Sequence, residues 1–175
     1  MSFILNNIMY CSKVVPINIF LISICLIGFS SCDPMGDISD IPKLWFISFS
    51  KSEMLQGDIN QDSVWLELGF EDGNGDLGFG SKSSDKDIFV VDRRTNIIQD
   101  AYKLPDLPDS QGKTISGTIR LRIYTTCCIF PQGIPPCTSP AQFPLDSLSF
   151  EIYLKDRSGN ESKKINSPYL YLKCL

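Results

Sequence analysis

The sequence predicts an all-β domain, a two-sheet antiparallel β-sandwich of about seven strands, preceded by a signal peptide. Several segments alternate apolar and polar residues with a period of two, which is typical of half-buried strands. Clusters of turn-forming residues separate these segments, and no stretch has a convincing helical period. Strands with one apolar face must bury it against a second layer, so a sandwich is favoured, with an open barrel as the main alternative.

The expected strands follow one another at short spacing along the chain. Alternation is clearest in residues 64–71, 119–124 and 148–155. Further strands are expected at 44–49, 88–91, 97–102 and 169–172. The turns between them contain Asp-Gly and Asn-Gly pairs, whose residues tolerate the backbone angles that tight turns need.

The N-terminal region predicts export from the cytoplasm. An apolar run extends from residue 14 to residue 29 behind Lys13, and Pro16, Asn18 and Ser23 interrupt it. A membrane-spanning helix needs about 20 apolar residues, so the shorter run is typical of a cleaved signal peptide. We therefore predict a lipoprotein signal peptide over residues 1–31.

The end of this run resembles the bacterial lipobox. Phe29-Ser30-Ser31-Cys32 places small residues before a cysteine, although Phe29 stands where the lipobox usually has Leu. In lipoproteins the cysteine thiol receives a diacylglycerol and the new amino terminus is acylated, so the resemblance implies a membrane anchor at Cys32. The alternative is ordinary cleavage near Ser31, with Cys32 left as a plain thiol. Residues 32–43 are expected to form a flexible tether and residues 44–175 the domain.

The cysteines predict two disulfides in the domain. Of seven cysteines, Cys11 and Cys25 lie in the signal peptide. Four remain beyond the anchor, and an even number in an exported domain favours disulfides over a zinc site: Cys127, Cys128, Cys137 and Cys174. If the strand that begins near residue 119 continues through Cys127, that side chain shares a face with the inward apolar residues. This predicts the pairs Cys127–Cys174 and Cys128–Cys137.

An acidic, glycine-rich segment predicts either a calcium site or a hairpin turn. Asp72, Asn74 and Asp76 stand at alternate positions, as in the first half of an EF-hand loop. Leu77 and Ser83 replace the glycine and the glutamate that the EF-hand requires, so a true EF-hand is excluded. Calcium binding would need further ligands, for which there are three candidates: Glu71, Asp85 and Asp87. The alternative is a turn that simply needs Gly, Asn and Asp.

Composition favours a binding protein over an enzyme. Histidine is absent, which removes the commonest general base and metal ligand, and we predict no catalytic residues. With 16 basic and 20 acidic residues and no basic patch, nucleic acid is not an expected partner. The expected partners are the lipid membrane and an envelope protein or glycan. The alternative function is a carbohydrate-binding accessory that uses aromatic platforms: Trp45, Trp65, Tyr102, Tyr124 and Tyr153.

Three segments, 70–78, 124–128 and 155–162, resemble a group of small, uncharacterised envelope lipoproteins of the Bacteroidota type. The turn from Asp156 to Asn160 also resembles the closing turn of many bacterial Ig-like modules. The resemblance implies an Ig-like sandwich and attachment to the cell envelope, at the outer membrane, with the periplasmic or surface side left open. It transfers no activity. The expected function, a membrane-anchored, non-catalytic binding or interaction module, follows from the predicted anchor, the predicted sandwich and the absence of predicted catalytic residues.

Overall fold

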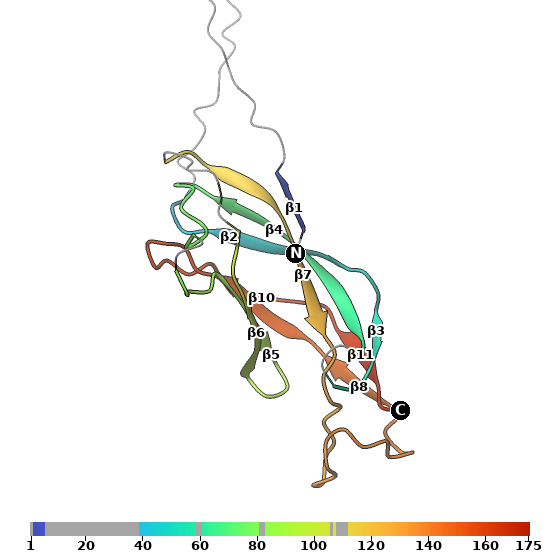
Figure 1. The fold of residues 1–175 in the computed structure, drawn as a ribbon. Helices are drawn as coiled ribbons and strands as arrows, with labels where there is room; N and C mark the ends of the chain where they lie inside the picture. Colours follow the sequence, from blue (N-terminus) through green and yellow to red (C-terminus); the bar gives the residue numbers. More distant parts are fainter. Residues whose placement is uncertain (1, 6–38, 59–60, 81–82, 106, 108–111) are drawn as a thin grey trace, which may run out of the picture.

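The computed structural model describes residues 2–5, 39–58, 61–80, 83–105, 107 and 112–175 (Figure 1). The predicted lipidation site Cys32, residues 1 and 6–31 of the predicted signal peptide and residues 32–38 of the tether lie outside these ranges, whereas residues 2–5 of the predicted signal peptide form a strand that pairs with residues 117–120. The described residues form strands and no helix, which confirms the all-β prediction. None of them belongs to a helix long and apolar enough to cross a bilayer.

The first sheet is antiparallel and contains the two longest strands. Its order is β1 (Ser2–Leu5), β7 (Ile115–Tyr124), β4 (Ser63–Asp72) and β2 (Lys43–Phe49). β4 and β7 pair along their whole length, with Asp72 opposite Ile115 at one end. The register therefore places Asp72 where the sheet stops and the acidic segment turns away from it.

Two smaller sheets complete the described fold. The second is antiparallel, in the order β10 (Ile165–Asn166), β9 (Phe150–Leu154), β5 (Ile88–Asp92) and β6 (Ile97–Tyr102). The third has the order β3 (Glu53–Leu55), β11 (Leu170–Lys173) and β8 (Leu145–Leu148), and β3 runs parallel to β11. The sequence predicts two sheets, whereas the described strands are hydrogen-bonded into three.

One hydrophobic core is shared by the sheets, because the period of two in each strand turns alternate side chains inward. Leu66 and Leu68 of β4 and Ile152 of β9 are fully buried, and they belong to one cluster of buried residues. Burying a side chain of this size contributes about 1.5–3 kcal/mol. The core therefore holds the ends of β4 and β9 in place, and both ends carry residues of the candidate site.

The predicted strand 148–155 is interrupted in the structure. β8 ends at Leu148 and pairs with β11, whereas β9 begins at Phe150 and pairs with β5. Between them Ser149 is buried, and its carbonyl oxygen accepts a hydrogen bond of 3.1 Å from the backbone N–H of Arg93. The apolar alternation continues through this point, so the sequence pattern alone does not reveal that the chain changes sheets.

The predicted disulfide pairing is wrong, although all four cysteines are paired. The structure joins Cys127 to Cys137 and Cys128 to Cys174, with Cα–Cα distances of 4.7 and 6.0 Å. The prediction assumed that a strand continues through Cys127, but β7 ends at Tyr124. In the irregular segment that follows, Cys128 is the buried member of the adjacent pair, and it therefore meets the buried Cys174.

Candidate metal centre

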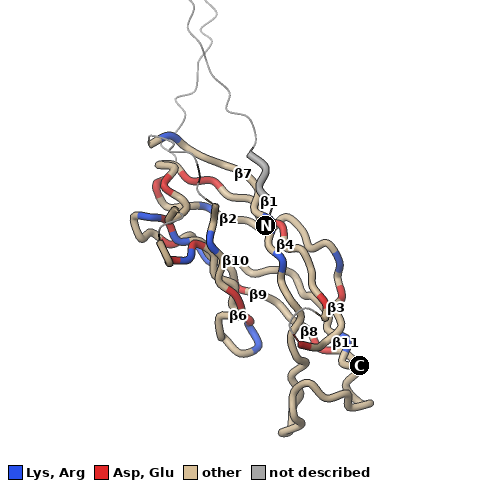
Figure 2. The backbone as a smooth tube through the Cα atoms, viewed as in Figure 1, with Lys and Arg blue, Asp and Glu red and all other residues tan. Residues whose placement is uncertain are grey.

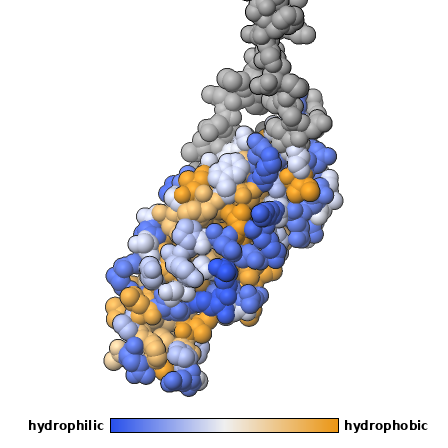
Figure 3. All heavy atoms as spheres, turned by 180° about the vertical axis from the view of Figure 1, so that it is seen from behind, coloured by the Kyte–Doolittle hydropathy of each residue, from blue (hydrophilic) through white to orange (hydrophobic). Residues whose placement is uncertain are grey.

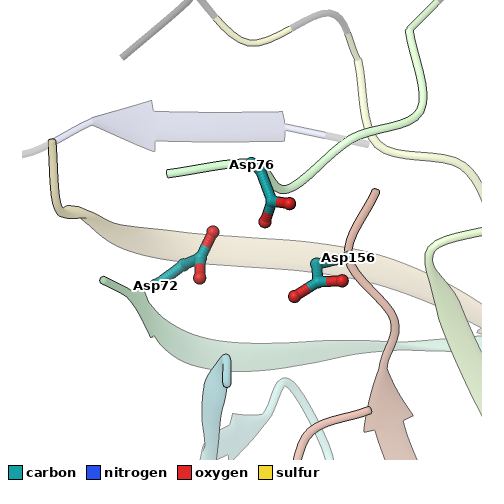
Figure 4. Close-up of side chains that lie close together, drawn as sticks. All are labelled: Asp72, Asp76 and Asp156. Carbon is teal, nitrogen blue, oxygen red and sulfur yellow. The ribbon is translucent and has the colours of Figure 1, made fainter. Parts of the chain in front are cut away.

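Three aspartates from different parts of the chain converge beside the end of β4 (Figure 4). Asp72 is the last residue of β4, Asp76 lies in the loop after it, and Asp156 follows β9. One carboxylate oxygen from each lies within 4.8 Å of the other two. We call these three residues the aspartate cluster.

Asp72 is fully buried, yet one of its oxygens has no partner. Its Oδ2 accepts a hydrogen bond of 3.2 Å from the backbone N–H of Leu77. Its Oδ1 is buried and has no hydrogen-bond partner. A buried carboxylate oxygen without a partner is costly, because desolvation is not offset by a new contact.

Asp76 is held by the turn that carries Asp156. Its Oδ2 accepts hydrogen bonds from the backbone N–H and the hydroxyl of Ser158, at 3.2 and 2.5 Å. Its backbone carbonyl accepts from the backbone N–H and the Nε of Arg157, at 3.2 and 2.8 Å. The Oδ1 of Asp76, like that of Asp72, is buried without a partner.

Asp156 is also fully buried, and it shapes the turn that the sequence predicted. Its Oδ1 accepts from the backbone N–H of Asn160 at 2.7 Å, and its Oδ2 accepts from the Asn160 side-chain amide at 2.9 Å. Gly159 in this turn has a φ of 89°, a conformation that glycine adopts at little cost. The turn therefore fixes the Asp156 carboxylate facing the other two.

The negative charges of the aspartate cluster are unfavourable without a nearby cation. Burial, together with the nearby carboxylates of Asp76 and Asp156, raises the pKa of Asp72 to about 6, against the pull of backbone N–H donors. Among the described residues, no ion pair includes any of the three aspartates. The cluster therefore offers oxygen ligands and negative charge, the two features that a hard divalent cation requires.

The structure brings two of the three residues of the predicted calcium site together and adds a third from elsewhere in the chain. Asp72 and Asp76 come together, whereas the Oδ1 of Asn74 accepts a hydrogen bond of 3.3 Å from the backbone N–H of Asp76. Asp156 takes the third place in the cluster, and sequence reasoning missed it as a ligand. The only local signal for Asp156 is the turn from Asp156 to Asn160, which the sequence predicts as a turn and not as a source of ligands.

The three further ligands suggested by the sequence lie outside the cluster. Glu71 pairs with Lys43 at 2.9 Å. Asp85 accepts a hydrogen bond of 2.7 Å from the Ser83 hydroxyl. Asp87 is buried and accepts backbone hydrogen bonds from Phe79 and Leu104, at 2.9 and 2.7 Å, so its role is structural.

A second feature is a cavity of about 550 Å³ between the β5–β6 hairpin and the segment that follows β7. Its walls are mostly apolar and include five such residues: Ile97, Ile129, Phe130, Ile134 and Pro136. The loop 125–144 that forms one side contains no charged residue, and it is drawn wholly in tan in Figure 2. Figure 3 shows hydrophobic surface at the end of the molecule farthest from the grey residues.

A largely buried arginine that lines this cavity forms ion pairs with two aspartates. The guanidinium of Arg94 contacts Asp92 at 2.6 Å and Asp146 at 2.6 Å, and it donates to the carbonyl of Cys127 at 3.2 Å. We call Arg94, Asp92 and Asp146 the Arg94 cluster. Nearby, the Oε1 of Gln99 is buried without a partner, while its Nε2 donates to the Tyr124 carbonyl at 3.1 Å.

Two of the five aromatic residues proposed as sugar platforms, Trp65 and Tyr153, stack on other side chains of the protein, whereas Trp45 is exposed. The guanidinium groups of Arg120 and Arg122 lie 4.9 and 4.7 Å from the ring centre of Trp65. Tyr153 stacks on Phe89 with ring centres 4.9 Å apart. These rings are therefore occupied, and they offer less surface for stacking against a glycan.

Comparisons of the chain with protein-family models, with curated proteins and with solved structures found no match.

Proposed function

We propose that this chain is an envelope lipoprotein, anchored through acylated Cys32, whose domain is a non-catalytic module that binds another envelope protein. The observation that carries the binding role is the apolar cavity beside the loop 125–144. Ligand sites in proteins are typically concave, mostly apolar cavities of this size with a few polar groups. The Ig-like sandwich belongs to the same proposal, supported by the core that the first two sheets share.

Export is supported by the disulfides and by the sequence before the domain. Disulfides persist in oxidising compartments, and all four cysteines of residues 44–175 are paired in the structure. The apolar run, Ser30, Ser31 and Cys32 together match the pattern of a lipoprotein precursor. More than one acyl chain anchors a protein stably, whereas a single chain binds a membrane only marginally.

The cavity wall is built to persist in the absence of a partner. The Cys127–Cys137 disulfide closes the loop that carries Ile129, Phe130 and Ile134. Arg94 fixes the start of the same loop through the Cys127 carbonyl. A preformed apolar surface loses little conformational entropy on binding, which favours affinity.

The chemistry of the cavity favours a protein partner over a glycan. Ile97 and Ile129 line it and are 67% and 42% exposed, so apolar area is available for burial. The unpartnered Oε1 of Gln99 can accept one hydrogen bond, such as that of a peptide N–H. An apolar side chain next to a backbone donor is what an extended peptide segment presents.

The non-catalytic part of the proposal is supported by the burial of two carboxylates of the aspartate cluster. Asp72 and Asp156 are fully buried, so a substrate as large as a sugar cannot contact their carboxylates. A bare ion is the ligand that fits this environment.

The binding role is tested by photo-crosslinking in the natural envelope. The parent protein carries a photoreactive residue at position 134, which lines the cavity. Ile97→Asp and Ile129→Asp are each added to this parent as test variants. The control is Ile47→Asp, a residue that is 44% exposed on β2 outside the cavity. We expect one discrete adduct in the parent that decreases at least tenfold in the two cavity variants and persists in the control. Equal adduct in all variants, or no adduct with any envelope protein, would contradict the proposal.

The anchor is tested separately by fractionation. Cys32→Ala should move the protein from the membrane fraction to the soluble fraction of the envelope, because the acyl chains provide the membrane affinity. Retention of this variant in the membrane would show that Cys32 is not the anchor.

A further inference from the structure

The aspartate cluster differs from the other buried carboxylates that the structure describes. Asp87 and Asp92 have donors on both carboxylate oxygens, from backbone N–H groups or from Arg94. In the aspartate cluster, Asp72 and Asp76 each keep one buried oxygen with no donor. Two such oxygens pointing toward a third carboxylate indicate a ligand rather than a packing role (Figure 4).

We propose that Asp72, Asp76 and Asp156 form a calcium site that joins the loop after β4 to the turn after β9. Each aspartate offers one carboxylate oxygen, and these three oxygens lie within 4.8 Å of one another; the unpartnered Oδ1 atoms of Asp72 and Asp76 are the ligand atoms that the proposal assigns to these two residues. Calcium takes six to eight oxygen ligands, so water or carbonyl oxygens complete its shell. This proposal does not depend on the membrane anchor or on the apolar cavity.

The size of the cluster fits one calcium ion. Calcium lies about 2.3–2.6 Å from its oxygens, so two ligands of one ion are at most about 5 Å apart. The three oxygens here lie within 4.8 Å of one another. Magnesium keeps most of its water and binds through one or two carboxylates, whereas this cluster offers three, two of them fully buried.

The site is preorganised by hydrogen bonds that leave the Oδ1 atoms of Asp72 and Asp76 without a donor, whereas both oxygens of Asp156 accept from Asn160. Ser158 binds Oδ2 of Asp76, Leu77 binds Oδ2 of Asp72, and Arg157 binds the backbone carbonyl of Asp76. These contacts hold residues 76 and 158 together, although 82 positions separate them along the chain. They leave both Oδ1 atoms without a hydrogen-bond donor.

A cation removes the electrostatic penalty of the cluster. Three carboxylates in contact repel one another, and Arg157, the basic residue of the turn, donates to the carbonyls of Asp76 and Leu77. A divalent ion offsets this repulsion and gives the two bare oxygens a partner. Binding therefore stabilises the folded state, because the unfolded chain does not bring the three residues together.

The test is calcium titration of the full-length protein after treatment with a chelator, followed by calorimetry and thermal unfolding at pH 7.5. We expect one calcium ion per chain and an increase of several degrees in the unfolding midpoint. Magnesium at the same concentration should have a smaller effect. No binding heat and an unchanged midpoint would overturn the proposal, and an equal response to magnesium would overturn the assignment to calcium.

Substitutions distinguish the proposed site, which includes Asp156, from the site that the sequence pattern predicts, which includes Asn74. Asp156→Asn and Asp76→Asn should each weaken calcium binding at least tenfold, because each removes a charged ligand. Asn74→Ala should keep calcium affinity within about threefold, and the exposed Asp85→Asn is the charge-matched control outside the cluster. Wild-type affinity in Asp156→Asn, or loss of binding only in Asn74→Ala, would contradict the proposal.

Discussion

The Arg94 cluster and the aspartate cluster both bring aspartates together at the ends of strands, yet they reach opposite electrostatic states. Arg94 lies between Asp92 and Asp146 and contacts both at 2.6 Å. Asp72, Asp76 and Asp156 have no such cation among the described residues, and two of their oxygens lack any partner. The same protein can neutralise buried carboxylates with its own side chains. Where it does not, a counter-ion from solution is the simplest explanation.

The two clusters also differ in the contacts that hold their surroundings in place. The Arg94 cluster lies beside the segment that both disulfides hold, so its geometry is secured by covalent bonds and an internal ion pair. The aspartate cluster is formed by a loop and a turn joined by hydrogen bonds. The charges of the Arg94 cluster are thus balanced by an internal ion pair, whereas the proposed site takes its cation from solution.

The largest effect is expected from removing the arginine. Arg94→Met should lower the free energy of unfolding by about 3–5 kcal/mol, because Asp92 and Asp146 then stay buried without their cation. Urea unfolding measures this change. A loss below about 1 kcal/mol would show that the Arg94 cluster does not depend on its internal ion pair.

The next effect is expected from the disulfide beside Arg94. Replacing both Cys127 and Cys137 by Ala should lower the free energy of unfolding by about 3 kcal/mol. A disulfide between residues 10 positions apart removes about this much loop-closure entropy from the unfolded chain, and the variant regains it. Calcium should still raise the unfolding midpoint of this variant. Peptide mapping without reduction should link Cys127 to Cys137, and a Cys127–Cys174 peptide would contradict the structure.

The aspartate cluster should make the metal-free protein less stable as the pH rises. The pKa of Asp72 is raised from 3.8 to about 6 in the folded state, so protonation favours folding. The stability that Asp72 contributes to the folded state is fully present below about pH 4. It is lost as the pH rises through about 6, and this loss in the free energy of unfolding is on the order of 2 kcal/mol. Thermal unfolding with a chelator should show this loss in the wild type.

Asp72→Asn is the matched control for this pH dependence. It should lack the loss and be more stable than the metal-free wild type at pH 7.5. A variant that loses stability at this pH would indicate that the Asp72 charge is already compensated.

The smallest effect is expected from an ion pair on the surface. Lys43→Met leaves Glu71 exposed to water, so the free energy of unfolding should change by less than about 1 kcal/mol. Urea unfolding of Lys43→Met and of Arg94→Met compares the free energy of unfolding lost with an exposed ion pair and with a largely buried one. A change as large as that of Arg94→Met would contradict the distinction drawn here.

The sequence predicts features that depend on neighbouring residues and misses those that depend on distant contacts. The alternation in β4 and β7 identifies both strands, and the spacing of Asp72 and Asp76 identifies two members of the cluster. Asp156 lies 80 positions after Asp76, and its place in the cluster follows from the packing of β9 against β5 rather than from local spacing.

Two of the errors in the predicted fold have the same origin. The disulfide pairing depends on where β7 ends, and nothing in the run Tyr124 to Cys128 marks that end. The division at Ser149 depends on which strand lies alongside, since Leu148 and Phe150 are both buried. Alternation reports which side chains face inward, and it carries no information about the partner strand.

The most direct test of the central claim is the titration of the Asp72 carboxyl carbon by NMR, with and without calcium, using Asp72→Asn to assign the signal. The uncompensated cluster predicts a pKa of about 6 for Asp72 in the metal-free protein. Saturating calcium should lower that pKa below the ordinary aspartate value, because the ion binds the charged form. An ordinary pKa in the metal-free protein, or one that calcium leaves unchanged, would contradict the account.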